Sequence, residues 1–309
     1  MKKFALAAAA AATALTLSAC GGSSTTGVCP GNVNPDGRRR DIAIPTSLDD
    51  FPAMCTALAK AGVTPIAMAG KEQWPLERFM AYQPFRMEGE DYVAKLKKGQ
   101  AKFSDPAGTK AATWLADLGK AGCFQKGFSS LGYTDAENLF TAGTAAVYNM
   151  GTWELPALAT DKLPADIRDD VDFFTLPTIA GAKTGPNDYV APSGIGMAIN
   201  AKTYDPLVRD FLKFALTNYP SRYAAAGALA PTKTEVTIPA NATPLYQKAL
   251  TTADSVGKLA MPWDTQLDPT TNTKLQQELV LLVQGDVTPQ QSIETMVTTL
   301  AQNAPKFFG

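Results

Sequence analysis

The chain has 309 residues, of which 45% are hydrophobic and 18% charged, so it can build one large domain or two modest ones. Its net charge of -1 argues against an electrostatic hold on nucleic acid, and we expect no nucleic-acid partner. Because the sequence contains no His, it excludes Ser-His-Asp and Cys-His nucleophile pairs and His-containing zinc sites. We therefore expect a protein that is not an enzyme and that needs no metal or cofactor.

The N-terminus has the pattern of a targeting segment. Lys2 and Lys3 precede the apolar stretch Phe4–Leu17, which is shorter than the roughly 20 residues of a membrane-spanning helix. We interpret residues 1–19 as a signal peptide. The sequence LSAC, which ends at Cys20 and is followed by GGSS, resembles a bacterial lipobox, whose Cys is lipidated. The alternative is an ordinary cleavage site after Ala19.

Residues 20–45 are rich in Gly, Pro, Asn and Ser, which is typical of a flexible leader. Together with a lipidated Cys20, this leader predicts an exported lipoprotein that is anchored to the membrane in the periplasm or at the cell surface. The tight basic run Arg38–Arg40 lies in the leader, and we interpret it as a solvated linker.

The first half of the ordered chain alternates predicted helices and strands. A capping box of Ser47 and Asp50 opens a helix whose apolar residues recur at helical spacing up to Gly62. A second capping box, Thr134 with Glu137, opens a short helix that ends at Gly143. The remaining predictions for this half are a strand over Val63–Met68, a helix that starts at Pro75, a helix from Pro106 to Gly122 and a strand over Ala145–Met150.

The second half continues the alternation. The last helix has a strong start, with Thr288 as the cap, Pro289 at the first position and Gln291 at the third. The predicted strands are Val171–Leu176 and Tyr189–Ile199, and the predicted helices are Pro206–Leu216, Pro244–Val256, Thr273–Val283 and Pro289–Ala301. This alternation predicts the α/β class.

Three cysteines follow Cys20: Cys29, Cys55 and Cys123. An odd number allows at most one internal bridge, and in an exported protein such thiols can oxidise. Cys55 and Cys123 are the better-placed pair because Cys29 lies in the leader. The alternatives are a Cys55–Cys123 disulfide and two buried free thiols.

Three of the four tryptophans lie at the ends of predicted elements. Trp114 has core spacing in its helix, whereas Trp74 precedes a helix, Trp153 follows the strand-ending Gly151, and Trp263 follows Met261-Pro262. An ionisable group lies beside each of the three: Glu72 and Glu77, Glu154, and Asp264. Indoles offer a flat apolar face and carboxylates accept hydrogen bonds, which together suit a sugar. The alternative is that each indole fills a domain edge.

Two other patterns do not support a dinucleotide-binding loop or a glycosidase active site. Ser193-Gly194-Ile195-Gly196 lacks the third glycine of a dinucleotide-binding loop and is followed by strand-like residues rather than a helix. We interpret it as a strand that allows close approach of backbone or ligand. The carboxylate groups at 49–50 and 169–172 fit a helix N-terminus and a solvated turn better than a glycosidase pair.

Several stretches, in order, resemble the carbohydrate-type extracellular solute-binding proteins of bacterial ABC importers, which include the maltose-binding proteins. The signature stretch matches through Phe140, Gly143, Ala145, Ala146, Gly151, Thr152 and Trp153. The other matching stretches are PTSLDDFPAMCTALAKAGVTPIAM (45–68), KEQWPLERF (71–79), FFTLPTIAG (173–181), PSGIGMAINAKT (192–203), PLVRDFLKF (206–214) and GDVTPQQSIETM (285–296).

The resemblance implies a periplasmic-binding-protein-like architecture of two α/β lobes that close on a sugar. It implies that Trp153 stacks on a sugar ring and that Trp74 lines the cleft. Ser193 and Gly194 would form a backbone turn at the cleft, and the pair Trp263-Asp264 would face the ligand. The signature does not fix Glu154, which is a candidate from its place beside Trp153. The implied partners are a carbohydrate and the transmembrane subunits of an ABC permease.

The chain departs from this family before Pro45, where members carry a long first part of the N-terminal lobe. We therefore expect one lobe nearly complete and the other partial. The expected parts are residues 46–190 for the first part of the C-terminal lobe, 191–245 for a partial N-terminal lobe and hinge, and 246–309 for the last helices of the C-terminal lobe. The expected function is capture of a mono- or oligosaccharide for import. The alternatives are a truncated, binding-defective remnant with an interaction or structural role and, third, a carbohydrate-active enzyme.

Overall fold

The computed structural model describes residues 42–159, 162–165, 167–168, 170–191, 197–230, 236, 238 and 242–309. This part of the chain is mixed α/β, as the sequence predicts. Its helices and strands, in chain order, are α1 (Asp50–Lys60), β1 (Thr64–Ala67), α2 (Trp74–Glu88), α3 (Tyr92–Lys97), α4 (Pro106–Lys120), α5 (Tyr133–Thr141), β2 (Ala145–Tyr148), β3 (Tyr189–Val190), α6 (Pro206–Ala225), α7 (Pro244–Asp254), β4 (Leu259–Ala260), α8 (Pro269–Gln284) and α9 (Pro289–Phe308). Short 3-10 helices cover Phe128–Ser130, Thr152–Glu154 and Trp263–Thr265.

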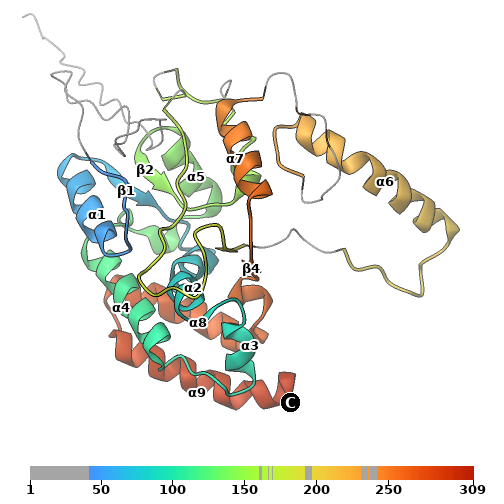
Figure 1. Ribbon diagram of the computed structural model, residues 1–309. Coiled ribbons are helices and arrows are strands. Elements are labelled where there is room, and N and C mark those ends of the chain that lie inside the picture. The colour runs from blue at the N-terminus through green and yellow to red at the C-terminus, as the bar shows by residue number, and fades with distance from the viewer. Residues whose placement is uncertain are drawn as a thin grey trace, which may run out of the picture.

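Most of the described helices form one body, in which α1 and α5 pack against the parallel pair β1–β2 (Figure 1). The core of this body joins side chains from α1, α2, α4, α8 and α9, including Phe51, Phe79, Leu115, Leu279 and Met296. A second parallel pair, β3–β4, aligns Tyr189 with Leu259 and Val190 with Ala260. Figure 1 shows β4 between α7 and the body, at the point where the chain returns to the body.

Local signals set several helix ends. Gly62, with φ +79°, follows α1. The cap predicted at Ser47 is wrong, because α1 starts at Asp50 with Asp49 as its N-cap, although the carboxylate of Asp50 accepts from Thr46 N and Ser47 N. The cap of α9 is the predicted one, because Thr288 Oγ1 accepts from Gln291 N and Gln291 Oε1 accepts from Thr288 N. The cap predicted at Thr134 is wrong. Gly132 is the N-cap of α5, two residues before Thr134, and Asp135 accepts from Gly132 N.

Cys55 on α1 and Cys123 just after α4 form a disulfide, with their Cα atoms 4.9 Å apart. Both residues are fully buried in the core of the body. The covalent link therefore joins two helices that also pack on each other. Cys20 and Cys29 lie outside the described residues.

Two predicted strands are absent or shortened. Residues 171–176 have no regular structure, and Tyr189–Ile199 yields a strand at Tyr189–Val190, while 192–196 lie outside the described residues. Strand-like residues need a neighbouring strand for their backbone groups. Here side chains take that place, since Lys248 Nζ donates to Phe173 O and Tyr82 Oη donates to Leu176 O.

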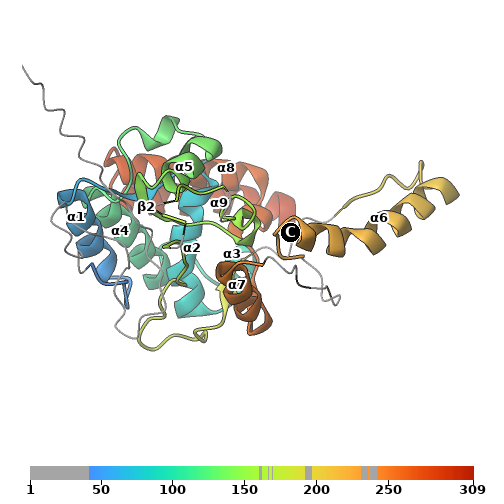
Figure 2. The ribbon, with the colours of Figure 1, turned by 90° about the horizontal axis from the view of Figure 1, so that it is seen from above.

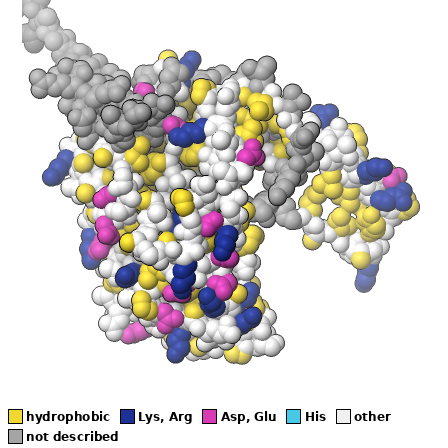
Figure 3. All heavy atoms as spheres, viewed as in Figure 1, with side chains coloured by type: hydrophobic (Ala, Val, Ile, Leu, Met, Phe, Trp, Pro, Cys, Tyr) yellow, Lys and Arg dark blue, Asp and Glu magenta, His cyan; other side chains and the backbone are white. Residues whose placement is uncertain are grey.

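Helix α6 stands away from the body in both ribbon views (Figures 1 and 2). It runs nine residues beyond the predicted end at Leu216, and Asp205 caps it by accepting from Val208 N. Apolar side chains are exposed along it, including Leu207 at 77%, Phe211 at 64% and Phe214 at 63%, and they form an apolar surface in Figure 3.

The fold is therefore one nearly complete α/β unit with part of a second. The lobe boundaries near residues 190 and 245 stay predictions. Among the described helices, none has the length and apolarity to cross a membrane.

Candidate ligand-binding site

The end of strand β2 places an indole on the surface. Gly151 follows the strand, and a Cβ at this position would lie 2.1 Å from the ring of Trp153, which means that the indole folds back over the glycine. The ring stays 40% exposed, and its Nε1 donates a hydrogen bond of 2.8 Å to Tyr133 Oη. Gly151, three residues after the end of β2, is thus a packing requirement of Trp153.

A strained turn places the second indole. Gln73 has φ +64° and ψ -37°, and Trp74 N donates to Glu72 O at 2.7 Å, which closes a three-residue γ-turn. A non-glycine residue in this conformation costs free energy and persists only where its surroundings hold it. The turn presents Trp74 at the first position of α2.

Trp74, Tyr133 and Trp153 form one aromatic cluster from three separate elements. The ring centroids of Trp74 and Tyr133 are 6.4 Å apart with an interplanar angle of 30°, and those of Trp74 and Trp153 are 6.4 Å apart at 61°. The structure thus brings together two of the tryptophans predicted for the site. Tyr133 was not predicted, since the sequence of α5 marks it only as the residue before Thr134.

An ion pair borders the aromatic cluster. The guanidinium carbon of Arg78 lies 5.0 Å from the centroid of the Trp74 ring, and its two terminal nitrogens donate to the carboxylate of Asp264 at 3.2 and 2.9 Å. Side chains of both residues are partly exposed. Sequence reasoning predicted Asp264 but missed Arg78. Its signal was its position four residues after Trp74, which places both on one face of α2.

Glu77 fixes the ion pair from below. This side chain is fully buried, and its Oε1 and Oε2 accept hydrogen bonds from Asp264 N at 2.6 Å and Gln276 Nε2 at 3.0 Å. Burial raises the pKa of Glu77 to about 7, against the opposing effect of these donors. Glu77 therefore ties α2, α8 and the turn at Trp263–Thr265 together beneath Arg78.

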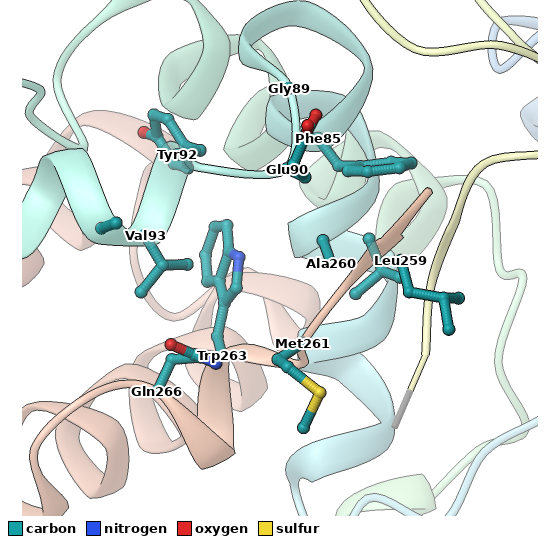
Figure 4. A pocket seen from close by; sticks show the side chains of 12 residues that line it. Phe85, Gly89, Glu90, Tyr92, Val93, Leu259, Ala260, Met261, Trp263 and Gln266 are labelled. Carbon is teal, nitrogen blue, oxygen red and sulfur yellow. The ribbon is translucent and has the colours of Figure 1, made fainter. Parts of the chain in front are cut away.

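Trp263 does not join the aromatic cluster. Its ring is 3% exposed and packs against Tyr92 and Phe103, with centroid separations of 6.0 and 5.6 Å. Figure 4 shows the indole between Tyr92 and Val93 on one side and Ala260 on the other, in a cavity of about 180 Å³. The 3-10 turn sends Asp264 to Arg78 and Trp263 into the core, so the expectation that both face a ligand is wrong for the indole.

Glu154 is also turned inward. The side chain is 6% exposed, and its Oε1 has no hydrogen-bond partner among the described residues. Burial raises the pKa of Glu154 to about 7. The carboxylate therefore does not lie on the exposed face of Trp153. Ser193 and Gly194 lie outside the described residues, so their predicted place at the cleft stays a prediction.

The arrangement combines flat apolar surface with hydrogen-bonding groups. The rings of Trp74 and Trp153 supply apolar faces, and Arg78, Asp264 and Tyr133 supply donors and acceptors beside them. Such a surface suits a ligand that has an apolar face and polar edges.

Comparison with known proteins identifies the family. Residues 34–218 match the family model of the bacterial extracellular solute-binding proteins, which is more than half of the chain. The chain belongs to this family. Its members are extracellular, which agrees with the predicted export.

The curated relatives have low sequence identity to this chain and are covered only in part. A "Multiple sugar-binding protein" of Streptococcus mutans is 26% identical over 167 residues, which cover 52% of this chain and 38% of the relative. An uncharacterized ABC transporter extracellular-binding protein of Pyrococcus horikoshii is 28% identical over 157 residues, which cover 50% of this chain and 35% of the relative. This solute-binding chain thus spans less than two fifths of the length of either relative.

Solved structures show the same fold. A chitin oligosaccharide binding protein superposes with a TM-score of 0.73 at 23% identity, over 85% of this chain and 66% of that one. The neighbours are two-lobe solute-binding proteins, in agreement with the predicted fold class.

Proposed function

We propose that this chain is the substrate-binding component of an ABC importer and that it captures a mono- or oligosaccharide. The single observation that carries the proposal is the partly exposed aromatic cluster of Trp74, Tyr133 and Trp153 beside the Arg78–Asp264 pair. Support also comes from relatives, whose names record binding of multiple sugars and of chitin oligosaccharide.

In this proposal the sugar ring lies on the indole of Trp153, with Trp74 as the second wall. The ring C–H groups contact the π faces, and hydroxyls at the ring edge donate to Asp264 and accept from Arg78. Tyr133 is a positioning residue, because its hydroxyl accepts from Trp153 Nε1 and so orients the indole. Glu77 holds Asp264 in place. Glu154 and Trp263 are left out of the contact set.

The proposal extends to cellular context. Cys20 would carry the lipid that anchors the protein, and the partners would be the carbohydrate and the transmembrane subunits of a permease. Binding requires no covalent chemistry, so no enzymatic step is proposed.

Isothermal titration calorimetry against a panel of mono- and oligosaccharides tests this function. We expect binding heat with one sugar class. Trp153→Ala should weaken the affinity for that sugar at least a hundredfold, and Asp264→Asn should weaken it about tenfold. Phe307→Ala, which removes another exposed aromatic, is the matched control and should bind like the parent chain.

Two outcomes would contradict the proposal. A cooperatively folded protein that gives no heat with any sugar would favour the remnant with an interaction or structural role. Release of reducing ends from oligosaccharides would favour a carbohydrate-active enzyme.

A further inference from the structure

A second concave surface lies far from the aromatic cluster. It runs between the end of α3 with the loop that follows it and the last turns of α9, and its volume is about 590 Å³. In Figure 1 this end of the body is opposite to β2 and α5. We call it the lysine groove. Its floor is Leu96, Phe103, Val297, Leu300, Ala304 and Phe308, and its rim is Lys97, Lys98 and Lys102.

The floor is apolar. Along α9 its residues recur from Val297 to Phe308 at spacings of three or four, so they form one file on one helix face. At 1.5 Å per residue this file is about 16 Å long. A single extended acyl chain can lie along such a file, with its carbons on the apolar side chains.

The rim carries positive charge, with the carboxylate of Asp105 beside it as the acceptor of Lys102 N. Among the described residues, no Asp or Glu lines the groove, and no ion pair involves Lys97, Lys98 or Lys102. Lys97 Nζ instead lies 4.4 Å from the centroid of the Phe308 ring, at the end of the file. In contrast, Lys95 on the same helix pairs with Asp91 at 2.9 Å.

The rim is also pre-organised. Gly99, with φ +67°, turns the chain after α3, and its N–H donates to Leu96 O. Gln100 N donates to Lys95 O, and Asp105 Oδ2 accepts from Lys102 N at 2.7 Å. The three lysines thus sit on a hydrogen-bonded turn rather than on a loose loop.

We propose that the lysine groove binds an anionic amphiphile with a single alkyl chain, of which a long-chain carboxylate is the simplest. Its chain lies along the apolar file of α9, and its carboxylate meets the ammonium groups of the rim. This proposal is independent of the sugar site, because no residue is shared.

Calorimetry with sodium dodecanoate below its micellar concentration tests the proposal. We expect dodecanoate to bind about two orders of magnitude more tightly than octanoate, since each buried methylene contributes about fourfold. Dodecyltrimethylammonium, with the same chain and a cationic head, should bind at least tenfold more weakly than dodecanoate.

Variants of the protein separate the contribution of the ligand's carboxylate from that of its alkyl chain. The triple change Lys97→Gln, Lys98→Gln and Lys102→Gln should weaken dodecanoate binding at least tenfold. The matched control, Lys60→Gln with Lys110→Gln and Lys126→Gln, removes the same charge elsewhere and should stay within twofold. Ala301→Leu fills the groove from an exposed helix position, so it should weaken binding tenfold while thermal unfolding is unchanged.

Three results would overturn the proposal. These are the absence of heat with dodecanoate, equal binding of the anionic and cationic amphiphiles, and no effect of Ala301→Leu in a folded protein. Binding to vesicles of phosphatidylglycerol without binding of monomeric dodecanoate would indicate a membrane-facing surface and would also overturn it.

Discussion

Apolar side chains are buried on the helices of the body but exposed on α6. Leu115 on α4 is fully buried, whereas Phe211, also in the middle of a helix, is 64% exposed. Both helices begin with an Asp at the N-cap and a Pro directly after it. The local signals therefore build a helix in either place, but burial depends on partners that are distant in the sequence. In the described residues, α4 has α1, α2, α8 and α9 as partners, and α6 has no comparable cover.

The largest contrast is expected between Leu115→Ala and Phe211→Ala. Leu115→Ala leaves a cavity in the core and should lower the free energy of unfolding by about 3 kcal/mol. Phe211→Ala removes an exposed side chain and should change it by less than about 0.5 kcal/mol. Urea unfolding followed by circular dichroism measures both. Similar losses for the two variants would show that α6 is packed in solution.

Removal of the disulfide is the next largest effect. The double change Cys55→Ala and Cys123→Ala should cost about 2–4 kcal/mol, because the link closes a long loop in the unfolded chain. The same change should leave tryptic cleavage at Lys213 and Arg222 on α6 at its original rate. If cleavage there accelerates as the body is weakened, the two regions unfold together and the contrast fails.

Sequence reasoning succeeded where signals are local. Thr288 with Gln291 marks the start of α9, and a glycine marks the end of α1, because caps and positive φ angles involve residues a few positions apart. It failed at 171–176, where β-branched and aromatic residues suggest a strand. Whether a strand forms depends on a distant neighbour, and here Lys248 and Tyr82 occupy that role.

In the candidate site, the sequence likewise indicates individual residues but not which of them meet. Trp74 and Trp153 could be named because both lie at element ends, but their meeting at Tyr133 requires the tertiary fold. The direction of Trp263 and Asp264 depends on one 3-10 turn, which the sequence Met-Pro-Trp-Asp does not reveal. Arg78 was missed because a lone Arg on a helix resembles any solvated charge.

A smaller effect is expected at Glu154, where the body meets α7. Glu154 precedes Leu155, which packs against Tyr246. Its folded-state pKa is raised to about 7 by burial, so the folded chain prefers the protonated form. The resulting stabilisation is complete below about pH 4.5 and is lost as the pH rises through 7. The free energy of unfolding of Glu154→Gln minus that of the parent chain should therefore be about 1–2 kcal/mol larger at pH 8 than at pH 5.

Urea unfolding at pH 5, 6, 7 and 8 measures this difference between Glu154→Gln and the parent chain. Glu77 shifts stability in the same direction in both proteins, so it cancels. A constant difference across this range would mean that Glu154 titrates normally and that this edge of the body is open to water.

The smallest effect distinguishes strain from ordinary helix propensity. Gln73→Gly should raise the free energy of unfolding by about 0.5 kcal/mol, because glycine adopts φ +64° without steric cost. Gln83→Gly, in the interior of helix α2, which Gln73 precedes, is the matched control and should lower the free energy of unfolding by about 1 kcal/mol. A strained turn persists only where packing over-determines it, as the contacts of α2 with α4 and α8 do. Opposite signs for the two variants would therefore mean that the body holds Trp74 in place at a cost that an uncovered helix such as α6 could not sustain. Destabilisation by both would mean that the turn before Trp74 is unstrained.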